Sequence, residues 1–336
     1  MSWLVQPRLV NGPFDDPALY VDFRFGRRAI LFDLGDVSAL SSRELLRVSH
    51  VFVSHTHLDH FAGFDTLLRL CLHRTEPLHL FGPAGFADRV DGKLGGYTWN
   101  LLDQNSPDFV TTASEFSDGR IARTAAFRAR EAFRRQEVDP PALPAGLLLQ
   151  EEEFWVEAAI LDHGIPCLAF ALQERVRVNV WKEGLAGLGL PVGPWLNAAK
   201  AAARRGEPDH FSVGVPGGTM PLGLLKERAL RIAPGQRLAY VTDAAGHDTN
   251  VAKIVALTRG ADQLFIEAAF LQEDEALARQ NHHLTAATAG RIARDAGALR
   301  VTPFHFSARY LGREEDLRRE VLDAGAGDGI GSQAMA

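Results

Sequence analysis

Residues 51–63, VFVSHTHLDHFAG, place an apolar run directly before four side chains that commonly bind metals: His55, His57, Asp59 and His60. The run Val51–Val53 predicts a buried strand, and the extended chain after it turns the first two histidines to the same side. Two imidazoles on one side can bind one cation. The last two ligands face elsewhere as the chain enters a helix over residues 61–70, so they are free for a second cation. The spacing therefore indicates two metals, with a polar turn carrying incidental histidines as the alternative.

Residues 55–60 match the pattern H-x-H-x-D-H at every fixed position. The segment therefore resembles the metallo-β-lactamase superfamily. That resemblance implies an α/β protein with an αββα sandwich and a dinuclear metal site at the sheet edges. The remaining ligands are then expected at strand ends further along the chain.

Three later side chains each follow a short apolar run that predicts a strand: His163, Asp243 and His305. His163 is the candidate third ligand of the first metal, and His305 supplies the last imidazole of the second. Asp243 is the candidate bridge between the two. Each alone could be a cap, a turn residue or a satisfied buried group, but all three obey the rule that ligands sit on loops held by rigid strands.

Five downstream segments resemble ribonuclease Z, a family of endonucleases that trim precursor tRNA at its 3′ side: LDHGIPCLAFALQE, LGLPVGP, FIEAAF, HHLTAATAG and FHFSARY. The resemblance covers roughly residues 28–70 and 157–312. It implies that one metal is held by His55, His57 and His163, the other by Asp59, His60 and His305, with Asp243 between them.

The same resemblance implies that Glu267 and His283 form an acid pair. It also implies that Asp33 is a carboxylate that supports the metal ligands without binding metal. Alternatives remain open at each position. Glu267 could be a polar strand end and His283 a cap for a helix over residues 285–296, with His282 as the rival acid; Asp33 could be a turn residue.

Phosphodiester hydrolysis needs a nucleophile, neutralisation of negative charge and a proton for the leaving alkoxide. Two divalent ions can serve the first two needs, with Asp59 as ligand and catalytic carboxylate and Arg309 as an additional positive charge. Glu267 could orient His283 as the proton donor. Zinc is the expected metal, although manganese and iron accept the same ligands.

Two departures from ribonuclease Z bear on the substrate. The family opens with a G-T-G loop and a P-x-K-x-R-N element that approaches tRNA, whereas residues 6–23 read QPRLVNGPFDDPALYVDF. An insertion at residues 120–153 carries six arginines that could contact RNA or could simply be solvated: Arg120, Arg123, Arg128, Arg130, Arg134 and Arg135.

Composition sets broader limits. With 336 residues, 46% of them hydrophobic, the chain can bury the core of one large α/β domain. Its net charge of −6 argues against a protein that binds polyanions in general. Cys71 and Cys167 are too few for a disulfide framework. The chain shows neither a signal peptide at its start nor a run of about 18 apolar residues. A cytoplasmic protein without membrane contact is expected.

We expect a single domain over residues 1–323, followed by a disordered glycine-rich tail at 324–336. Residues 173–214 form a possible substrate arm with an alanine-rich helix and three clustered cations, Lys200, Arg204 and Arg205. In ribonuclease Z the matching arm holds the tRNA of the partner subunit, which implies a homodimer. A helix packed on its own domain is the alternative.

The sequence thus predicts a dinuclear metallohydrolase, a phosphodiesterase that processes precursor tRNA as ribonuclease Z does. The missing opening element keeps a second enzyme in view, a hydrolase of the same site acting on a small phosphodiester or another ester. A scaffold that binds metal or RNA without catalysis is the non-enzymatic alternative, and the full ligand set counts against it.

Overall fold

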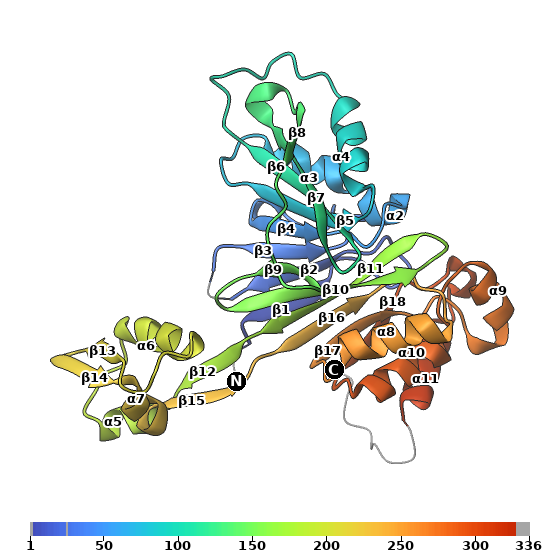
Figure 1. The fold of residues 1–336 in the computed structure, drawn as a ribbon. Coiled ribbons are helices and arrows are strands. Elements are labelled where there is room, and N and C mark those ends of the chain that lie inside the picture. Colours follow the sequence, from blue (N-terminus) through green and yellow to red (C-terminus); the bar gives the residue numbers. More distant parts are fainter. Residues whose placement is uncertain (1–2, 25, 327–336) are drawn as a thin grey trace.

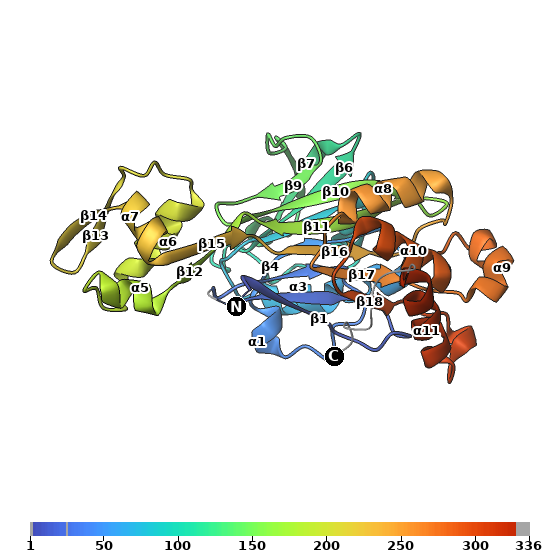
Figure 2. The ribbon, with the colours of Figure 1, turned by 90° about the horizontal axis from the view of Figure 1, so that it is seen from below.

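The structure is a computed structural model that describes residues 3–24 and 26–326. Two β-sheets lie face to face, helices cover the outer face of each, and a smaller module projects from one end (Figures 1 and 2). The expected αββα sandwich is confirmed. Within the described residues, no helix has both the length and the apolar character needed to cross a membrane.

The first sheet has eight strands whose spatial order follows the chain. They are β1 (Val5–Leu9), β2 (Leu19–Phe23), β3 (Ala29–Phe32), β4 (Val48–Phe52), β5 (Leu78–Pro83), β6 (Val110–Ser117), β7 (Arg120–Arg128) and β8 (Arg135–Val138). Strands β3 to β6 run parallel, and antiparallel pairs flank them on both sides. The carboxyl ends of the central strands therefore share one edge.

The second sheet has six strands in the order β18-β17-β16-β11-β10-β9. They are β9 (Leu147–Gln150), β10 (Phe154–Asp162), β11 (Pro166–Glu174), β16 (Arg237–Val241), β17 (Gln263–Glu267) and β18 (Val301–Phe304). Strands β16, β17 and β18 are parallel, so their carboxyl ends also meet at one edge.

Aromatic side chains fill the space between the sheets. Phe32 and Phe52 of the first sheet contact Phe170 of the second at centroid distances of 5.4 and 5.9 Å, and Tyr240 stacks on Phe32 at 5.9 Å. Each buried aromatic ring contributes a few kcal/mol to folding, by order of magnitude. This packing fixes the separation of the two sheets and hence of the loops at their edges.

The outer helices complete two further apolar layers. On the first sheet lie α1 (Ser42–Leu45), α3 (Phe64–Cys71) and α4 (Phe86–Gly95); on the second lie α8 (Asp248–Thr258), α10 (Ala286–Ala296) and α11 (Glu314–Gly325). Cys71 and Cys167 are buried and free, as expected. The predicted tail starts at 324, but α11 continues to Gly325; residues 327–336 lie outside the described residues.

The projecting module comprises residues 176–234, which extends further along the chain than the arm expected over 173–214. Its elements are β12 (Val176–Val180), α5 (Lys182–Gly187), α6 (Trp195–Arg204), β13 (Ser212–Val215), β14 (Gly218–Pro221), α7 (Leu222–Arg228) and β15 (Leu230–Pro234). Strands β12 and β15 pair antiparallel and join the module to the body. The alanine-rich helix packs within a separate apolar cluster of this module.

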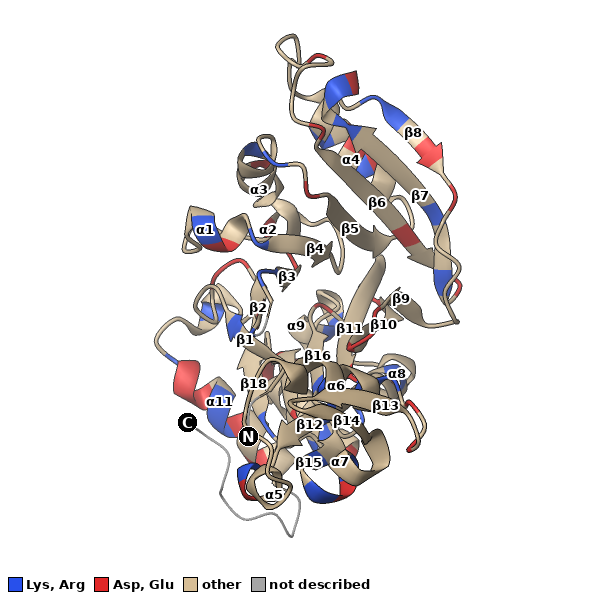
Figure 3. Ribbon diagram, turned by 90° about the vertical axis from the view of Figure 1, so that its left-hand side faces the viewer, with Lys and Arg blue, Asp and Glu red and all other residues tan. Residues whose placement is uncertain are grey.

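The basic insertion expected over residues 120–153 is divided between the two sheets: its arginine-rich part belongs to the first sheet, and residues 147–150 form β9 of the second. Residues 120–128 form β7, and the chain continues through η1 (Ala129–Glu131) to the edge strand β8. Three of its arginines pair with acidic side chains: Arg123 with Glu137 at 2.8 Å, Arg128 with Asp108 at 2.5 Å and Arg135 with Asp88 at 2.6 Å. Figure 3 shows basic and acidic residues interspersed here. Those three arginines are therefore largely neutralised, which weakens the expectation of RNA contact.

Candidate metal centre and active site

The seven candidate ligands converge from loops at the carboxyl ends of strands in both sheets. His55 and His57 follow β4, Asp59 and His60 lie in α2 (Leu58–Phe61), and His163, Asp243 and His305 follow β10, β16 and β18. Potential ligand atoms form three groups in which every pair lies within 4.8 Å. Two contain only predicted ligands, namely His55, His57, His163 and Asp243, and Asp59, His60 and His305; the third joins Asp243 and His305 to Glu267 and His283. The structure thus brings together all the ligands predicted for each of the two metals.

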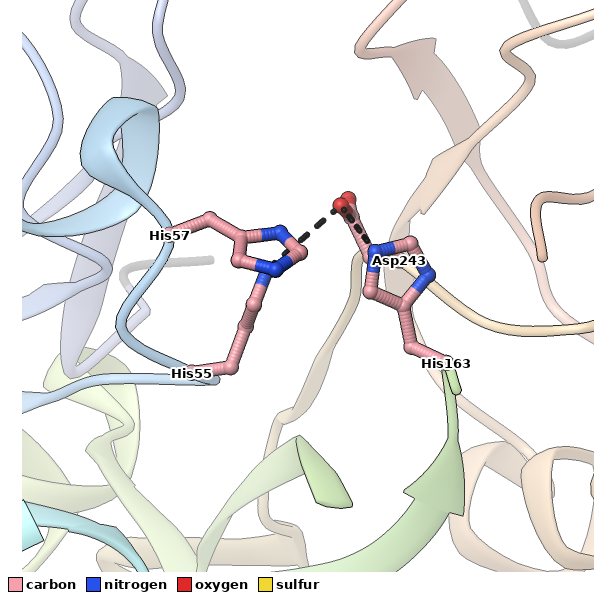
Figure 4. A group of neighbouring side chains, drawn as sticks. All are labelled: His55, His57, His163 and Asp243. Carbon is pink, nitrogen blue, oxygen red and sulfur yellow. Dashed lines mark ion pairs between the residues drawn. The ribbon is translucent and has the colours of Figure 1, made fainter. Parts of the chain in front are cut away.

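Asp243 lies between the two groups. Its Oδ2 is 3.3 Å from Nε2 of His163, 3.7 Å from Nε2 of His55 and 3.5 Å from Nε2 of His60. Figure 4 marks its ion pairs with His55 and His163. Burial alone would raise the pKa of Asp243. His305 and His60 have the opposite and larger effect, so the pKa lies well below its usual range. An ionised carboxylate in this position can be shared by two cations.

The second group is built around Asp59. Its Oδ2 lies 3.3 Å from Nε2 of His60 and 3.3 Å from Nε2 of His305, and Nδ1 of His305 is 3.2 Å from Oδ1 of Asp243. His305 has a φ of 58°, a backbone conformation that non-glycine residues seldom adopt. Such local strain persists only where surrounding contacts determine it, and here it directs the imidazole into the cluster.

Unpaired nitrogen atoms test whether metals fit this site. Nε2 of His55, Nε2 of His60 and Nδ1 of His305 are buried without a hydrogen-bond partner. Leaving such an atom unpaired costs about 1–3 kcal/mol, so three in one cluster need a common explanation. Five imidazoles and two carboxylates are ligands that suit divalent zinc, manganese or iron. The residues present therefore fit two divalent cations.

Asp33 supports the ligands from behind. It is fully buried, with a φ of 57° just beyond β3, and its Oδ2 lies 2.9 Å from Nδ1 of His60. The same carboxylate accepts hydrogen bonds from Ser54 and from the Tyr240 hydroxyl. These contacts orient His60 with Nε2 toward Asp243, which favours the supporting role over that of a simple turn residue.

Two other ligands are also oriented through their second nitrogen. Nδ1 of His163 donates to the His282 carbonyl at 2.8 Å, and Nδ1 of His55 lies 3.0 Å from the Ser54 hydroxyl. Burial lowers the pKa of His55 to about 2, and the nearby His60 contributes to the same shift. The imidazole is therefore neutral, the form that binds metal.

The buried Glu267 pairs with the half-buried His283 beside the cluster. Oε2 of Glu267 lies 2.8 Å from Nδ1 of His283, while its Oε1 accepts from the backbone N–H of Ala244 and Leu284. Burial lowers the pKa of His283, but Glu267 raises it more, to about 9. His283 also groups with Asp243, so a protonated imidazole is held next to the proposed metal site.

His282 does not share this pairing. It has a φ of 59°, its carbonyl accepts from His163, and its ring lies against Gly164, where an added Cβ would come within 3.2 Å of Nε2. Glu267 therefore selects His283 over its neighbour as the candidate acid.

Sequence reasoning missed a second set of supporting contacts. The Asn250 side chain accepts from the Asp162 N–H and donates to the carbonyls of Asp162 and Ala245, at 2.7–3.0 Å. It thereby ties the loop before His163 to the loop after Asp243. Asn250 lies in the first turn of α8, and nothing in the local sequence distinguishes it from an exposed helix residue.

Comparisons with known proteins identify the family of this chain. The family described as "Beta-lactamase superfamily domain" matches residues 226–306. A ribonuclease Z from Deinococcus radiodurans is 34% identical over 326 residues, covering 96% of this chain and 95% of the relative. The chain belongs to the ribonuclease Z family. A second member of that family, from Thermobifida fusca, is 30% identical and covers 88% of this chain and 80% of its own length.

Solved structures support the fold. The metallo-β-lactamase-fold protein YhfI from Bacillus subtilis matches 96% of this chain and 93% of its own, with a TM-score of 0.55 and 15% identity. The short form of human tRNase Z matches 90% and 93%, with a TM-score of 0.51 and 18% identity.

The segment that replaces the opening element usual in the ribonuclease Z family lies beside the metal cluster. Phe306 donates its N–H to the Pro13 carbonyl at 2.7 Å, and the Phe14 and Phe306 rings are 5.5 Å apart. Burial and the nearby Asp59 raise the pKa of Asp16. An acidic loop therefore occupies this border of the site. The sequence showed that the usual opening element is missing but not where the replacing segment lies.

Of the positive residues expected to bind substrate, only Arg309 lies close along the chain to a proposed ligand. Arg309 lies in η3 (Ala308–Tyr310), four residues after His305, and is exposed. Its guanidinium is therefore available to a substrate that approaches from solvent.

The three cations of the module are placed differently. Arg204 and Arg205 pair with Glu153 and Glu152 of the body at 2.9 and 3.1 Å, while Lys200 is half-buried and burial lowers its pKa. Both arginines are therefore paired with acidic side chains at the base of the module. These contacts weaken the expectation that Lys200, Arg204 and Arg205 all bind RNA.

Proposed function

We propose that this chain is a metal-dependent phosphodiesterase that cleaves precursor tRNA endonucleolytically at its 3′ side. One observation carries the proposal: six candidate ligands converge with Asp243, the seventh, in a chain aligned over 96% of its length with a ribonuclease Z. The pair of Glu267 and His283 adds a proton donor, which ester hydrolysis needs and simple metal storage does not.

The proposed metals are two divalent cations, with zinc expected. One would be held by His55, His57 and His163, the other by Asp59, His60 and His305, with Asp243 shared. When bound, such cations lower the pKa of water and stabilise negative charge on a phosphate. Asp59, which borders the exposed side of the cluster, would act as a catalytic carboxylate as well as a ligand.

The chain's own residues account for the remaining chemistry. His283, held by Glu267 through Nδ1, donates the proton from Nε2 to the leaving oxygen of the ribose. Glu267 keeps the imidazole protonated and oriented. The exposed Arg309, four residues after His305, would add positive charge near the phosphate.

Metal content is the first test of the site. Elemental analysis of the metal-replete protein should find two divalent ions per chain. His57→Ala should remove at least one of these ions, and Asp243→Ala should weaken the binding of both. A folded, metal-replete sample with one ion or none would contradict the dinuclear site.

Cleavage of precursor tRNA, measured beside hydrolysis of a small phosphodiester at the same metal loading, tests the activity. Efficient and site-specific cleavage of the tRNA is expected. Efficient turnover of the small ester without tRNA cleavage would favour the second candidate function, a hydrolase of small esters. The acidic loop beside Asp59, in place of the P-x-K-x-R-N element, is the observation that favours this alternative. Failure of both reactions would favour a non-catalytic scaffold.

We further infer a cytoplasmic homodimer in which the projecting module contacts RNA bound to the partner subunit. The separate apolar cluster of the module supports a semi-independent role, and two buried free thiols suit a reducing compartment. Sedimentation at several protein concentrations tests the dimer, and a monomer at all of them would exclude it.

A further inference from the structure

One residue of the metal-binding segment takes no part in the ligand cluster. Leu58 stands between His57 and Asp59 as the first residue of α2, and 80% of its surface is exposed. Adjacent Cα atoms lie about 3.8 Å apart, so this side chain starts directly beside two proposed ligands. Acidic or polar residues suit the first turn of a helix, and a leucine gains nothing there from water. The site therefore has an apolar surface at its rim.

We propose that Leu58 contacts the nucleobase of a nucleotide that adjoins the scissile phosphate. This inference rests on the proposed function, because a phosphate that reaches His57 and Asp59 brings its attached nucleosides to the residue between them. Bases in single-stranded RNA can leave the stack, and their exposed faces are commonly covered by protein side chains. Lone exposed leucines need no ligand in general, but Leu58 differs because two ligands flank it.

The opposite loop has a similar character. Ile165, 41% exposed, follows His163 by two residues on the turn between β10 and β11. The rings of His57 and His163 are 5.3 Å apart, so the two apolar side chains border the same imidazole pair from different sheets. An RNA strand that approaches the loops at the edges of the two sheets would meet both side chains, and the more exposed Leu58 offers the larger contact.

Coupling between protein and substrate tests this contact. Precursor tRNAs that carry an abasic ribose on either side of the cleavage site are compared with the intact substrate. The wild type should lose about 5- to 20-fold in kcat/KM when the contacted base is removed, the scale expected for partial burial of one leucine. Leu58→Ser should cleave the intact and abasic substrates equally, whereas Leu58→Met should keep the wild-type ratio.

Leu299→Ser is the matched control. Leu299 is 69% exposed and precedes β18 at the end opposite His305, so this variant should keep the wild-type ratio. Metal content is measured for every variant. If Leu58→Ser loses metal, Leu58→Ala takes its place and the same ratio decides.

Two results would overturn the contact: a wild type indifferent to both abasic positions, or a Leu58→Ser variant that keeps the wild-type ratio. A changed sedimentation coefficient with an unchanged ratio would assign Leu58 to a contact between copies of the chain and refute the nucleobase contact. If even the wild type fails on precursor tRNA yet turns over a small phosphodiester, the proposed function itself fails and the inference falls with it. Cleavage of tRNA without coupling overturns the role of Leu58 alone.

Discussion

The contact between Nδ1 of His283 and Glu267 leaves Nε2 as the nitrogen that can give a proton to the substrate. His283→Ala should keep the metal content and slow release of an alkoxide by about 10²–10⁴-fold, the usual scale of general acid catalysis. A substrate with a nitrophenolate leaving group should be affected far less, because it departs without a proton. His282→Ala, which removes a ring not paired with Glu267, is the control. Equal losses on both substrates would assign His283 to structure or metal binding.

Asp33 is a residue where stability and metal affinity should change together. Asp33→Ala leaves partners such as His60 and Tyr240 without their acceptor, at about 1–3 kcal/mol for each buried group. It should lower the free energy of unfolding by about 3–5 kcal/mol and weaken metal binding by about 10–100-fold. Asp33→Asn, which tolerates the positive φ and keeps one acceptor oxygen, should lose less. Thermal unfolding and metal titration measure both effects; an unchanged metal affinity would remove the supporting role.

At the scale of the element, β4 carries a buried histidine as well as leading to the ligands. Burial, together with His79 and Arg28, lowers the pKa of His50 to about 3. The folded protein keeps this ring neutral, while the unfolded chain takes up a proton near pH 6.5. The contribution of the neutral His50 ring to the free energy of unfolding is therefore complete above pH 6.5. It is lost as the pH falls from 6.5 toward 3, by about 1.4 kcal/mol per pH unit.

His50→Phe should flatten this dependence, because a phenyl ring can stack on Phe52 and Phe81 as the imidazole does. Unfolding by urea at several pH values between 4 and 7 measures the slope for the wild type and the variant. His210→Phe, at an exposed position, is the control and should keep the wild-type slope. Identical slopes for all three proteins would show that His50 does not titrate in this way.

The sequence predicted the elements with strong local patterns and missed those determined by distant contacts. The apolar run that precedes Asp243 predicted a strand, and a helix was expected over residues 285–296; the structure has them as β16 and α10. The sheet position of residues 120–128 was not predicted, because arginines on the exposed face hide the alternation. The contacts of Asn250 and Tyr240 join segments far apart in the chain, so no local signal could reveal them.

At the scale of the whole molecule, the paired strands β12 and β15 define where the module can be removed. Arg177 and Ala233 lie opposite each other in the pairing, so a short Gly/Ser turn can join them. This excision should keep metal binding and hydrolysis of a small phosphodiester but greatly reduce cleavage of precursor tRNA, because remote contacts position a large substrate. Unchanged tRNA cleavage would exclude the module from substrate binding.

A narrower excision of residues 177–207 is the informative comparison. It removes α6 and leaves the apolar side chains of β13, α7 and β15 without their partners. That variant should aggregate or unfold, although the excised segment is shorter. Solubility and circular dichroism of the two variants distinguish a module that folds as one unit from a flexible loop.

The carboxylate of Glu267 makes three contacts at once: with the ring of His283, with the N–H of Leu284 and with the N–H of Ala244, the residue after the proposed bridging aspartate. The proposed proton donor and the centre of the candidate ligand cluster are therefore coupled through one side chain. Any motion that withdraws the acid from the substrate also disturbs the backbone that carries Asp243. A designer who wished to retune the leaving-group preference of this protein would have to alter the imidazole while leaving its anchor intact.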